Sequence, residues 1–189
     1  MVTLSHRLFG RAFEVGLTTG RSMGFTRAAW AVAGGFREDL YAGEDVNFSG
    51  TIVSSGLRTQ LVPAAEVSWR PRVTWRANAV MYRTYARGDV RRGRRGRHLV
   101  RALGWTAAPA VAIAGTRAGR VLVGVAVAAY VGLPGARAVR VGLPVREWWR
   151  LPLLVAMKDL AQCVGAAEGV GDALRGRPQP PPRGDHPER

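Results

Sequence analysis

The sequence predicts an α/β domain that is followed by apolar α-helices. Residues 1–90 alternate short strand-like and helix-like segments with turns, as a soluble α/β domain does. Residues 91–174 open with an arginine cluster and then become strongly apolar. Residues 175–189 contain several prolines and almost no apolar side chains, which is typical of a disordered tail. We therefore expect three regions with boundaries near residues 90 and 174.

Within the first region, turn residues separate the predicted elements. Gly34 and Gly35 end the first helix and Gly56 ends the second, because glycine accepts the left-handed conformation of a helix stop. The predicted elements, in order, are a strand at 22–26, a helix at 27–33, a helix at 44–55, strands at 57–62 and 66–69, and a helix at 74–86.

The helix predicted at 74–86 carries two stripes at helical spacing. One is mostly apolar and is expected to face the core: Trp75, Ala79, Tyr82 and Ala86. The other is basic: Arg72, Arg76, Arg83 and Arg87. A basic stripe is either a solvated helix face or a phosphate clamp, and the pattern leaves both interpretations open.

The second region contains two apolar runs, at 99–116 and 121–136, separated by Arg117 and Arg120. A membrane-spanning helix needs about 20 apolar residues. The runs are thus compatible with a two-helix membrane hairpin, with helices in the membrane interface, or with buried helices of a soluble domain. A cluster of basic residues lies immediately before the first run. By the positive-inside rule, this cluster places the segment that carries it, and with it the first region, on the cytoplasmic side of a cell membrane. The cluster consists of Arg87, Arg91, Arg92, Arg94, Arg95 and Arg97.

Composition narrows the function only slightly. The formal net charge of +15 comes almost entirely from arginine, and it favours nucleic acid, anionic lipid or phosphorylated substrates without choosing among them. The single cysteine, Cys163, excludes an internal disulfide. The three histidines are scattered, and no metal-ligand cluster or Ser-His-Asp arrangement is apparent.

Two adjacent carboxylates, Glu44 and Asp45, follow Gly43 at the start of the second predicted helix. Acidic residues in a first helical turn complement the helix dipole, a stabilisation of roughly 0.3–1 kcal/mol. A carboxylate beside a flexible loop is also well placed to act as a general base. The pattern alone favours the dipole interpretation.

Several motifs surround this pair in a fixed order. The run from Gly20 to Trp30 is followed by Gly34-Gly35-Phe36, by Gly43-Glu44-Asp45-Val46 and by Pro63-Ala64-Ala65-Glu66-Val67-Ser68-Trp69. An Arg/Tyr-rich helix end follows at residues 82–89. This order of motifs resembles the second half of the catalytic domain of family 2 glycosyltransferases. The resemblance covers residues 18–90 and continues weakly through residues 151–169.

This resemblance implies a partial GT-A-like, nucleotide-sugar-binding α/β fold. It implies transfer of a sugar from a nucleotide-sugar donor to a lipid-linked or cell-envelope glycan acceptor. Asp45 would be the general base that deprotonates the acceptor hydroxyl, and Glu44 would orient it, since adjacent carboxylates can raise one another's pKa. The acceptor side of the cleft would be lined by Gly34, Gly35, Phe36, Trp69 and Arg83.

The chain also departs from the family pattern. Family members hold a divalent metal, Mg or Mn, and the nucleotide diphosphate with an Asp-x-Asp motif in a preceding half-domain, and this chain contains no Asp-x-Asp. We therefore expect an incomplete enzyme that lacks its donor-binding half. The alternative is a non-enzymatic basic module that binds anionic membrane or nucleic acid through residues 87–97. Nucleic acid is the less favoured partner, because no recognised binding motif is present.

Overall fold

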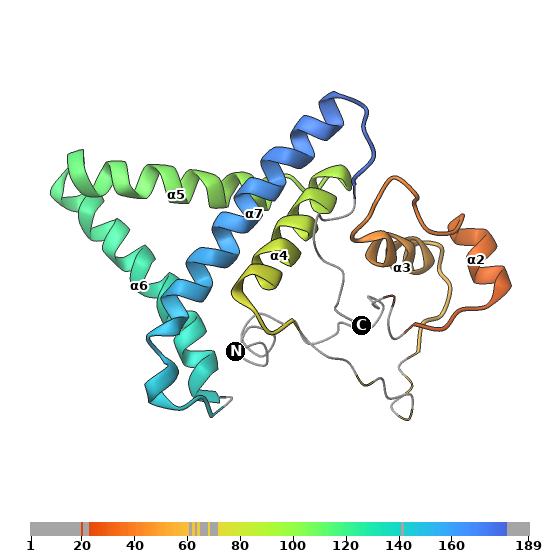
Figure 1. Ribbon diagram of the computed structural model, residues 1–189, viewed down its shortest axis with the longest axis horizontal. Coiled ribbons are helices and arrows are strands. Elements are labelled where there is room, and N and C mark those ends of the chain that lie inside the picture. Colours follow the sequence, from red (N-terminus) through yellow and green to blue (C-terminus); the bar gives the residue numbers. More distant parts are fainter. Residues whose placement is uncertain are drawn as a thin grey trace.

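The computed structural model describes residue 20 and residues 23–60, 62, 64, 68, 72–140 and 142–180. In these residues the regular structure is entirely helical (Figure 1). The elements are α2 (Arg27–Ala33), α3 (Glu44–Ser54), α4 (Trp75–Arg91), α5 (Gly96–Ala114), α6 (Arg117–Arg140), the 3₁₀ turn η2 (Val145–Glu147) and α7 (Arg150–Leu174).

The predicted α/β, GT-A-like fold is wrong for the described part of the chain, which contains no strand and no sheet. The strand predicted at 22–26 is not formed: its described residues, 23–26, lead directly into α2. There the Thr26 side chain accepts a hydrogen bond from Ala29 N–H. Residues 57–60 are exposed and have no regular structure. A strand needs a neighbouring strand for its backbone groups, and the described residues offer none. The strand expected at 66–69 lies almost wholly outside the described residues.

The helix pair α4–α7 is the structural spine of the molecule, because these two helices share the most extensive contact in the fold. Gly165 and Gly169 of α7 allow the close approach. A Cβ atom on Gly165 would lie 1.9 Å from the Arg83 carbonyl oxygen, and one on Gly169 would lie 2.7 Å from that of Arg87. Glycines four residues apart on one helix face let two backbones meet in this way.

Charge also joins α4 to α7. The Arg83 guanidinium donates hydrogen bonds to Glu168, and that of Arg87 donates to Asp172. The pKa of the Asp172 carboxyl is lowered from its ordinary value, chiefly by the hydrogen bond from Arg87. The basic stripe predicted on this helix is therefore neither a purely solvated face nor a phosphate clamp at these two positions. It pairs with acidic residues of α7.

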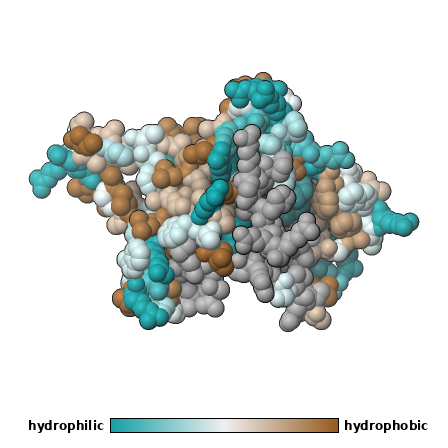
Figure 2. Space-filling model, viewed as in Figure 1, coloured by the Kyte–Doolittle hydropathy of each residue, from teal (hydrophilic) through white to brown (hydrophobic). Residues whose placement is uncertain are grey.

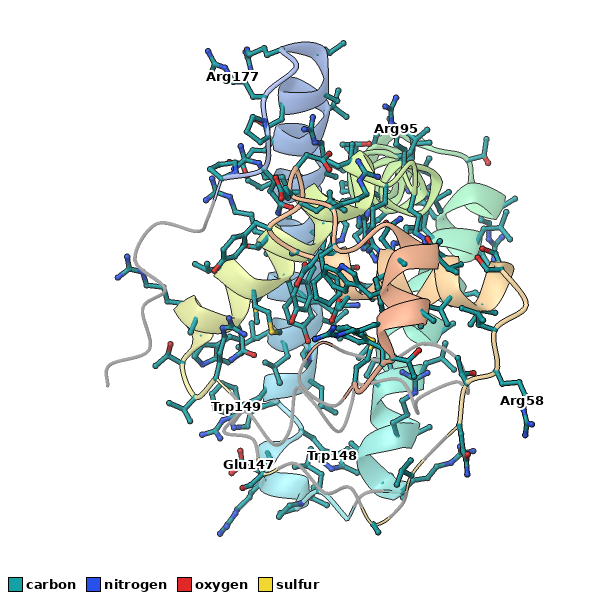
Figure 3. All side chains as sticks on the ribbon, turned by 90° about the vertical axis from the view of Figure 1, so that its right-hand side faces the viewer. Arg58, Arg95, Glu147, Trp148, Trp149 and Arg177 are labelled. Atoms are coloured by element: carbon teal, nitrogen blue, oxygen red, sulfur yellow. The ribbon has the colours of Figure 1, made fainter. Side chains whose placement is uncertain are left out.

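The apolar runs form α5 and α6, which extend away from the spine as an arm (Figure 1). The main contacts of α5 and α6 are with each other and with α7. In Figure 1 the three helices outline a triangle, and in Figure 3 α5 and α6 lie on the same side of α7. By length and composition α6 qualifies as a candidate membrane-spanning helix, and only 11% of its most apolar window is buried.

The short helices α2 and α3 form a separate lobe built on aromatic rings. Phe48 of α3 is 1% exposed and contacts Phe25, Trp30 and Phe36, with ring centroids 4.9–5.6 Å apart. The loop after α2 then runs across α4, where Gly88 leaves room for the Ala42 carbonyl.

Gln179 fastens this loop to the spine. Its side-chain Oε1 accepts hydrogen bonds from the N–H groups of Tyr41 and Ala42, each 3.2 Å, and its Nε2 donates to the Thr84 carbonyl at 2.9 Å. Its own backbone N–H donates to the Asp39 carbonyl. Gln179 is buried, so the beginning of the segment expected to be a disordered tail is held in place at this residue.

Candidate functional site

The first turn of α3 presents the two carboxylates that sequence reasoning singled out. Gly43 is the N-cap residue and has φ +87°, which favours glycine. Glu44 and Asp45 follow in the first turn. The Asp45 carboxylate accepts hydrogen bonds from Gly20 N–H at 2.9 Å and from Val46 N–H at 2.7 Å. These donors fix its direction and leave the residue partly exposed.

The surroundings of the Glu44 carboxyl favour its protonated form. Burial raises the pKa of the Glu44 carboxyl, and the nearby Asp45 charge raises it further. Its Oε2 atom is buried and accepts no hydrogen bond within the described part of the chain. The pair therefore combines a carboxylate held by N–H donors with a neighbour that more readily keeps its proton.

Arg92, at the end of α4, is a residue that sequence reasoning did not assign to the site. Its guanidinium lies against the N-cap of α3, since a Cβ on Gly43 would be 2.7 Å from the Arg92 Cζ and Nε atoms. Burial lowers the pKa of Arg92, while the charges of Asp45 and Glu44 act in the opposite direction. Arg92 also donates a hydrogen bond to Asp89. It thus lies between the acidic pair and the core of the molecule.

Behind Arg92, a buried polar network runs from α4 to α7. Asp89 is 2% exposed and pairs with Arg92, Arg97 and His98. His98 is equally buried, with its Nε2 3.1 Å from Asp89 Oδ2 and its Nδ1 3.0 Å from Arg101 Nη1. Burial, reinforced by the charges of Arg97 and Arg101, lowers the pKa of His98 from 6.5 to about 4. The neutral ring donates to Asp89 and accepts from Arg101.

Arg101 continues the network to a second buried carboxylate. Its Nε lies 2.9 Å from Asp159 Oδ1, and Lys158 Nζ lies 3.1 Å from the same oxygen. The Tyr130 hydroxyl donates to Asp159 Oδ2. Asp159 lies within an apolar stretch of α7. An acidic residue in such surroundings is the one feature of the sequence that indicates a buried polar network here.

The acceptor-side residues implied by the resemblance are brought together only in part. Gly34 and Gly35 end α2 with φ +70° and +77°, and a Cβ on Gly35 would meet the Trp30 ring at 2.8 Å. Phe36 packs into the aromatic cluster, 4.9 Å from Phe48 between ring centroids. These residues adjoin α3 and therefore share a lobe with Asp45.

Two other expected residues do not join them. Arg83 faces α7, and its guanidinium donates a hydrogen bond to Glu168. Trp69 lies outside the described residues. Of the residues that the resemblance implies, Gly34, Gly35 and Phe36 therefore share the α2–α3 lobe with Asp45, and Arg83 is engaged by α7 instead.

The resemblance implies a divalent metal, Mg or Mn, whose Asp-x-Asp ligand motif this chain lacks. The described residues contain no group of three or more His, Cys, Asp or Glu side chains that could hold an ion. We therefore assign no step to a metal.

Comparisons with known proteins return no match: no protein-family model, no curated protein and no solved structure matches this chain. The candidate site rests on its own geometry and chemistry.

Proposed function

We propose that the chain supplies the acceptor side of a membrane-associated glycosyltransferase, with Asp45 as the general base. The observation that carries the proposal is the Asp45 carboxylate, which is partly exposed at the start of α3 and oriented by two N–H donors. The proposed reaction depends on the Asp45 carboxylate and not on a β-sheet within the described residues.

The chemistry assigned to Asp45 is a proton transfer. The carboxylate takes the proton of an acceptor hydroxyl as that oxygen forms a bond to the anomeric carbon of the sugar. The bond from this carbon to the nucleoside diphosphate breaks, and the diphosphate leaves with the bonding electron pair. Glu44 precedes Asp45 in the same helical turn and is placed to orient it.

Surrounding features support a sugar acceptor. Phe25 and Trp30 stack with their ring centroids 5.4 Å apart, and they remain 45% and 40% exposed. Partly exposed aromatic side chains in the same lobe as Asp45 suit the apolar C–H face of a sugar ring. The apolar arm α5–α6 supports a lipid-linked acceptor and a location at the cell membrane. The arginines that precede α5 favour a catalytic part on the cytoplasmic side.

The proposal is tested by exchanging the chromosomal allele in the source cells. Membranes carrying the wild-type or the Asp45→Asn allele are supplied with a panel of labelled nucleotide sugars, and label in lipid extracts and envelope polymer is measured. We expect the exposed Glu38→Gln control to retain transfer and Asp45→Asn to lose it by about 100-fold or more. Unchanged incorporation in the Asp45→Asn membranes would show that this residue is not the base.

A second candidate function is a non-enzymatic module that binds an anionic membrane. The observation that favours it is the combination of the largely exposed α6 helix with the arginine cluster before α5. In that case Asp45→Asn changes no glycan, while the protein still sediments with membranes. Tight, salt-sensitive DNA binding by detergent-free protein would contradict both candidates and favour a nucleic-acid partner.

A further inference from the structure

The arm formed by α5 and α6 exposes apolar side chains along both helices. Figure 2 shows hydrophobic surface on this arm, which projects from the spine. Six of these side chains are between 55% and 83% exposed: Leu99, Leu103, Ile113, Leu122, Val125 and Leu133. Apolar surface on this scale marks a protein or membrane contact.

Arginines stand at every corner of the arm. Arg94 and Arg95 precede α5, Arg117 and Arg120 lie at the tip where α5 meets α6, and Arg137 and Arg140 lie in the last turn of α6. Near the same end, Trp149 is 61% exposed and has the Arg150 guanidinium over its ring (Figure 3). Arginine and tryptophan around an apolar surface match the headgroup level of an anionic bilayer.

The uncharged stretches of the arm are shorter than the hydrocarbon core, although α6 as a whole is long enough to span it. Residues 121–136, between Arg120 and Arg137, extend ~24 Å as a helix, and residues 102–114, the part of α5 after Arg101, extend ~20 Å. The hydrocarbon core is about 30 Å thick. The two helices also diverge from the tip (Figure 1), so each would be tilted in an end-on insertion and would reach less far.

The inner side of the arm is polar at its middle. Tyr130, about halfway along α6, donates its hydroxyl to Asp159, which also pairs with Arg101 and Lys158. A spanning α6 would carry this ionic cluster toward the bilayer centre, where charged side chains are strongly disfavoured. An arm that lies parallel to the membrane surface keeps this ionic cluster on the side that faces the protein. It also places all the corner arginines at the depth of the headgroups.

We infer that the α5–α6 arm lies in the plane of one leaflet of an anionic bilayer and does not cross it. The apolar side chains enter the acyl boundary, and the corner arginines contact phosphate headgroups. This inference rests on the membrane association within the proposed function and not on sugar transfer, so that loss of transfer in Asp45→Asn leaves it standing.

The side on which the arm ends lie tests this orientation. Single cysteines are placed at Ser55, Ala118 and Val145 in a Cys163→Ser background, and a membrane-impermeant maleimide is applied to inverted and to right-side-out membrane vesicles. All three positions are expected to react from the same side, and all three to react after detergent is added. If the cysteine at position 118 is labelled from the side opposite to that at position 55, the arm is a spanning hairpin. If only the cysteine at position 145 is labelled from the opposite side, α6 spans the membrane. Either result overturns the inference.

Binding to defined vesicles tests the partner. The purified full chain is mixed with phosphatidylcholine vesicles, with and without phosphatidylglycerol, and the bound fraction is measured by sedimentation. Replacing Arg117 and Arg120 together with glutamine should weaken binding to phosphatidylglycerol vesicles about 25-fold, which is about five-fold per arginine. The matched control is the exposed Arg58→Gln in the loop after α3, which should bind like wild type.

The apolar part of the surface is tested separately. Leu122→Gln with Val125→Gln should weaken binding to both kinds of vesicle, whereas Val53→Gln on α3 should not. Wild-type protein that stays off the vesicles and forms a stable dimer through α5–α6 would overturn the inference in favour of a second copy as the partner. Equal affinity for both kinds of vesicle would overturn the role of the arginines.

Discussion

Gly165 of α7 lies so close to Arg83 of α4 that a Cβ atom on the glycine would stand 1.9 Å from the arginine's carbonyl oxygen. The neighbouring atom is backbone, so it cannot move aside without moving its helix. Together with Gly169, which approaches the Arg87 carbonyl in the same way, this contact sets the separation of the two spine helices. It also brings the Arg83 side chain to Glu168, only three residues further along α7.

Gly165→Ala is therefore expected to destabilise the protein by about 1–3 kcal/mol, because the two helices must separate to admit the methyl group. The measurement is urea unfolding in mild detergent, followed by the helical circular dichroism signal. Gly124→Ala on α6 is the matched control, since its added Cβ meets no atom within 4 Å. The control should be neutral or more stable by about 0.5–1 kcal/mol. Equal stability of the two variants would contradict the close contact.

Asp159→Asn is expected to cost about 3–5 kcal/mol, because it leaves Arg101 and Lys158 without their buried carboxylate. Tyr130→Phe removes only the hydroxyl that reaches Asp159 and should cost less, about 1–3 kcal/mol. Both are measured by the same unfolding experiment. A larger loss in Tyr130→Phe than in Asp159→Asn would mean that α6, rather than the ion pairs, depends most on this contact.

His98 makes stability depend on pH in a definite direction. Its pKa is about 4 in the folded protein against 6.5 ordinarily, so the unfolded chain binds the proton more readily. The stabilisation is complete above about pH 6.5 and is lost as the pH falls toward 4, at up to about 1.4 kcal/mol per pH unit. His98→Gln should flatten this part of the stability profile. An unchanged slope in that variant would assign the pH dependence to other groups.

Gln179→Ala should release the loop at residues 39–42 from α4 while leaving the spine intact. The substitution removes the acceptor for the Tyr41 and Ala42 amides and the donor to Thr84. Hydrogen exchange should accelerate at these two amides and stay unchanged at α7. Protection that persists at residues 41 and 42 would show that the loop is held by other contacts.

The elements whose signals are local could be predicted from the sequence. The bounds of α2 and the start of α3 were predicted correctly, since Gly34 supplies the left-handed backbone that ends α2 and the acidic pair Glu44 and Asp45 occupies the first turn of α3. The buried face of α4 followed from the spacing of Tyr82 and Ala86. The two apolar runs became α5 and α6, with each helix extending a few residues beyond the run at one end or both.

The strands and the wider site could not be predicted in this way. Strand formation depends on a distant partner for its backbone groups, and residues that resemble a strand locally remain extended when no partner is present. Likewise Arg83 was expected beside an acceptor, and only the packing of α7 showed that Glu168 takes its guanidinium.

By itself, the sequence determined the bounds of α2, which residues are apolar, and that Glu44 and Asp45 open a helix, since each of these depends on neighbours a few residues away. Only the tertiary structure decided that Arg92 lies against that helix start and that Asp89, His98, Arg101 and Asp159 form one buried network. These residues come from three helices. Burial and pairing are properties of the space between those helices, and no local pattern in the chain encodes them.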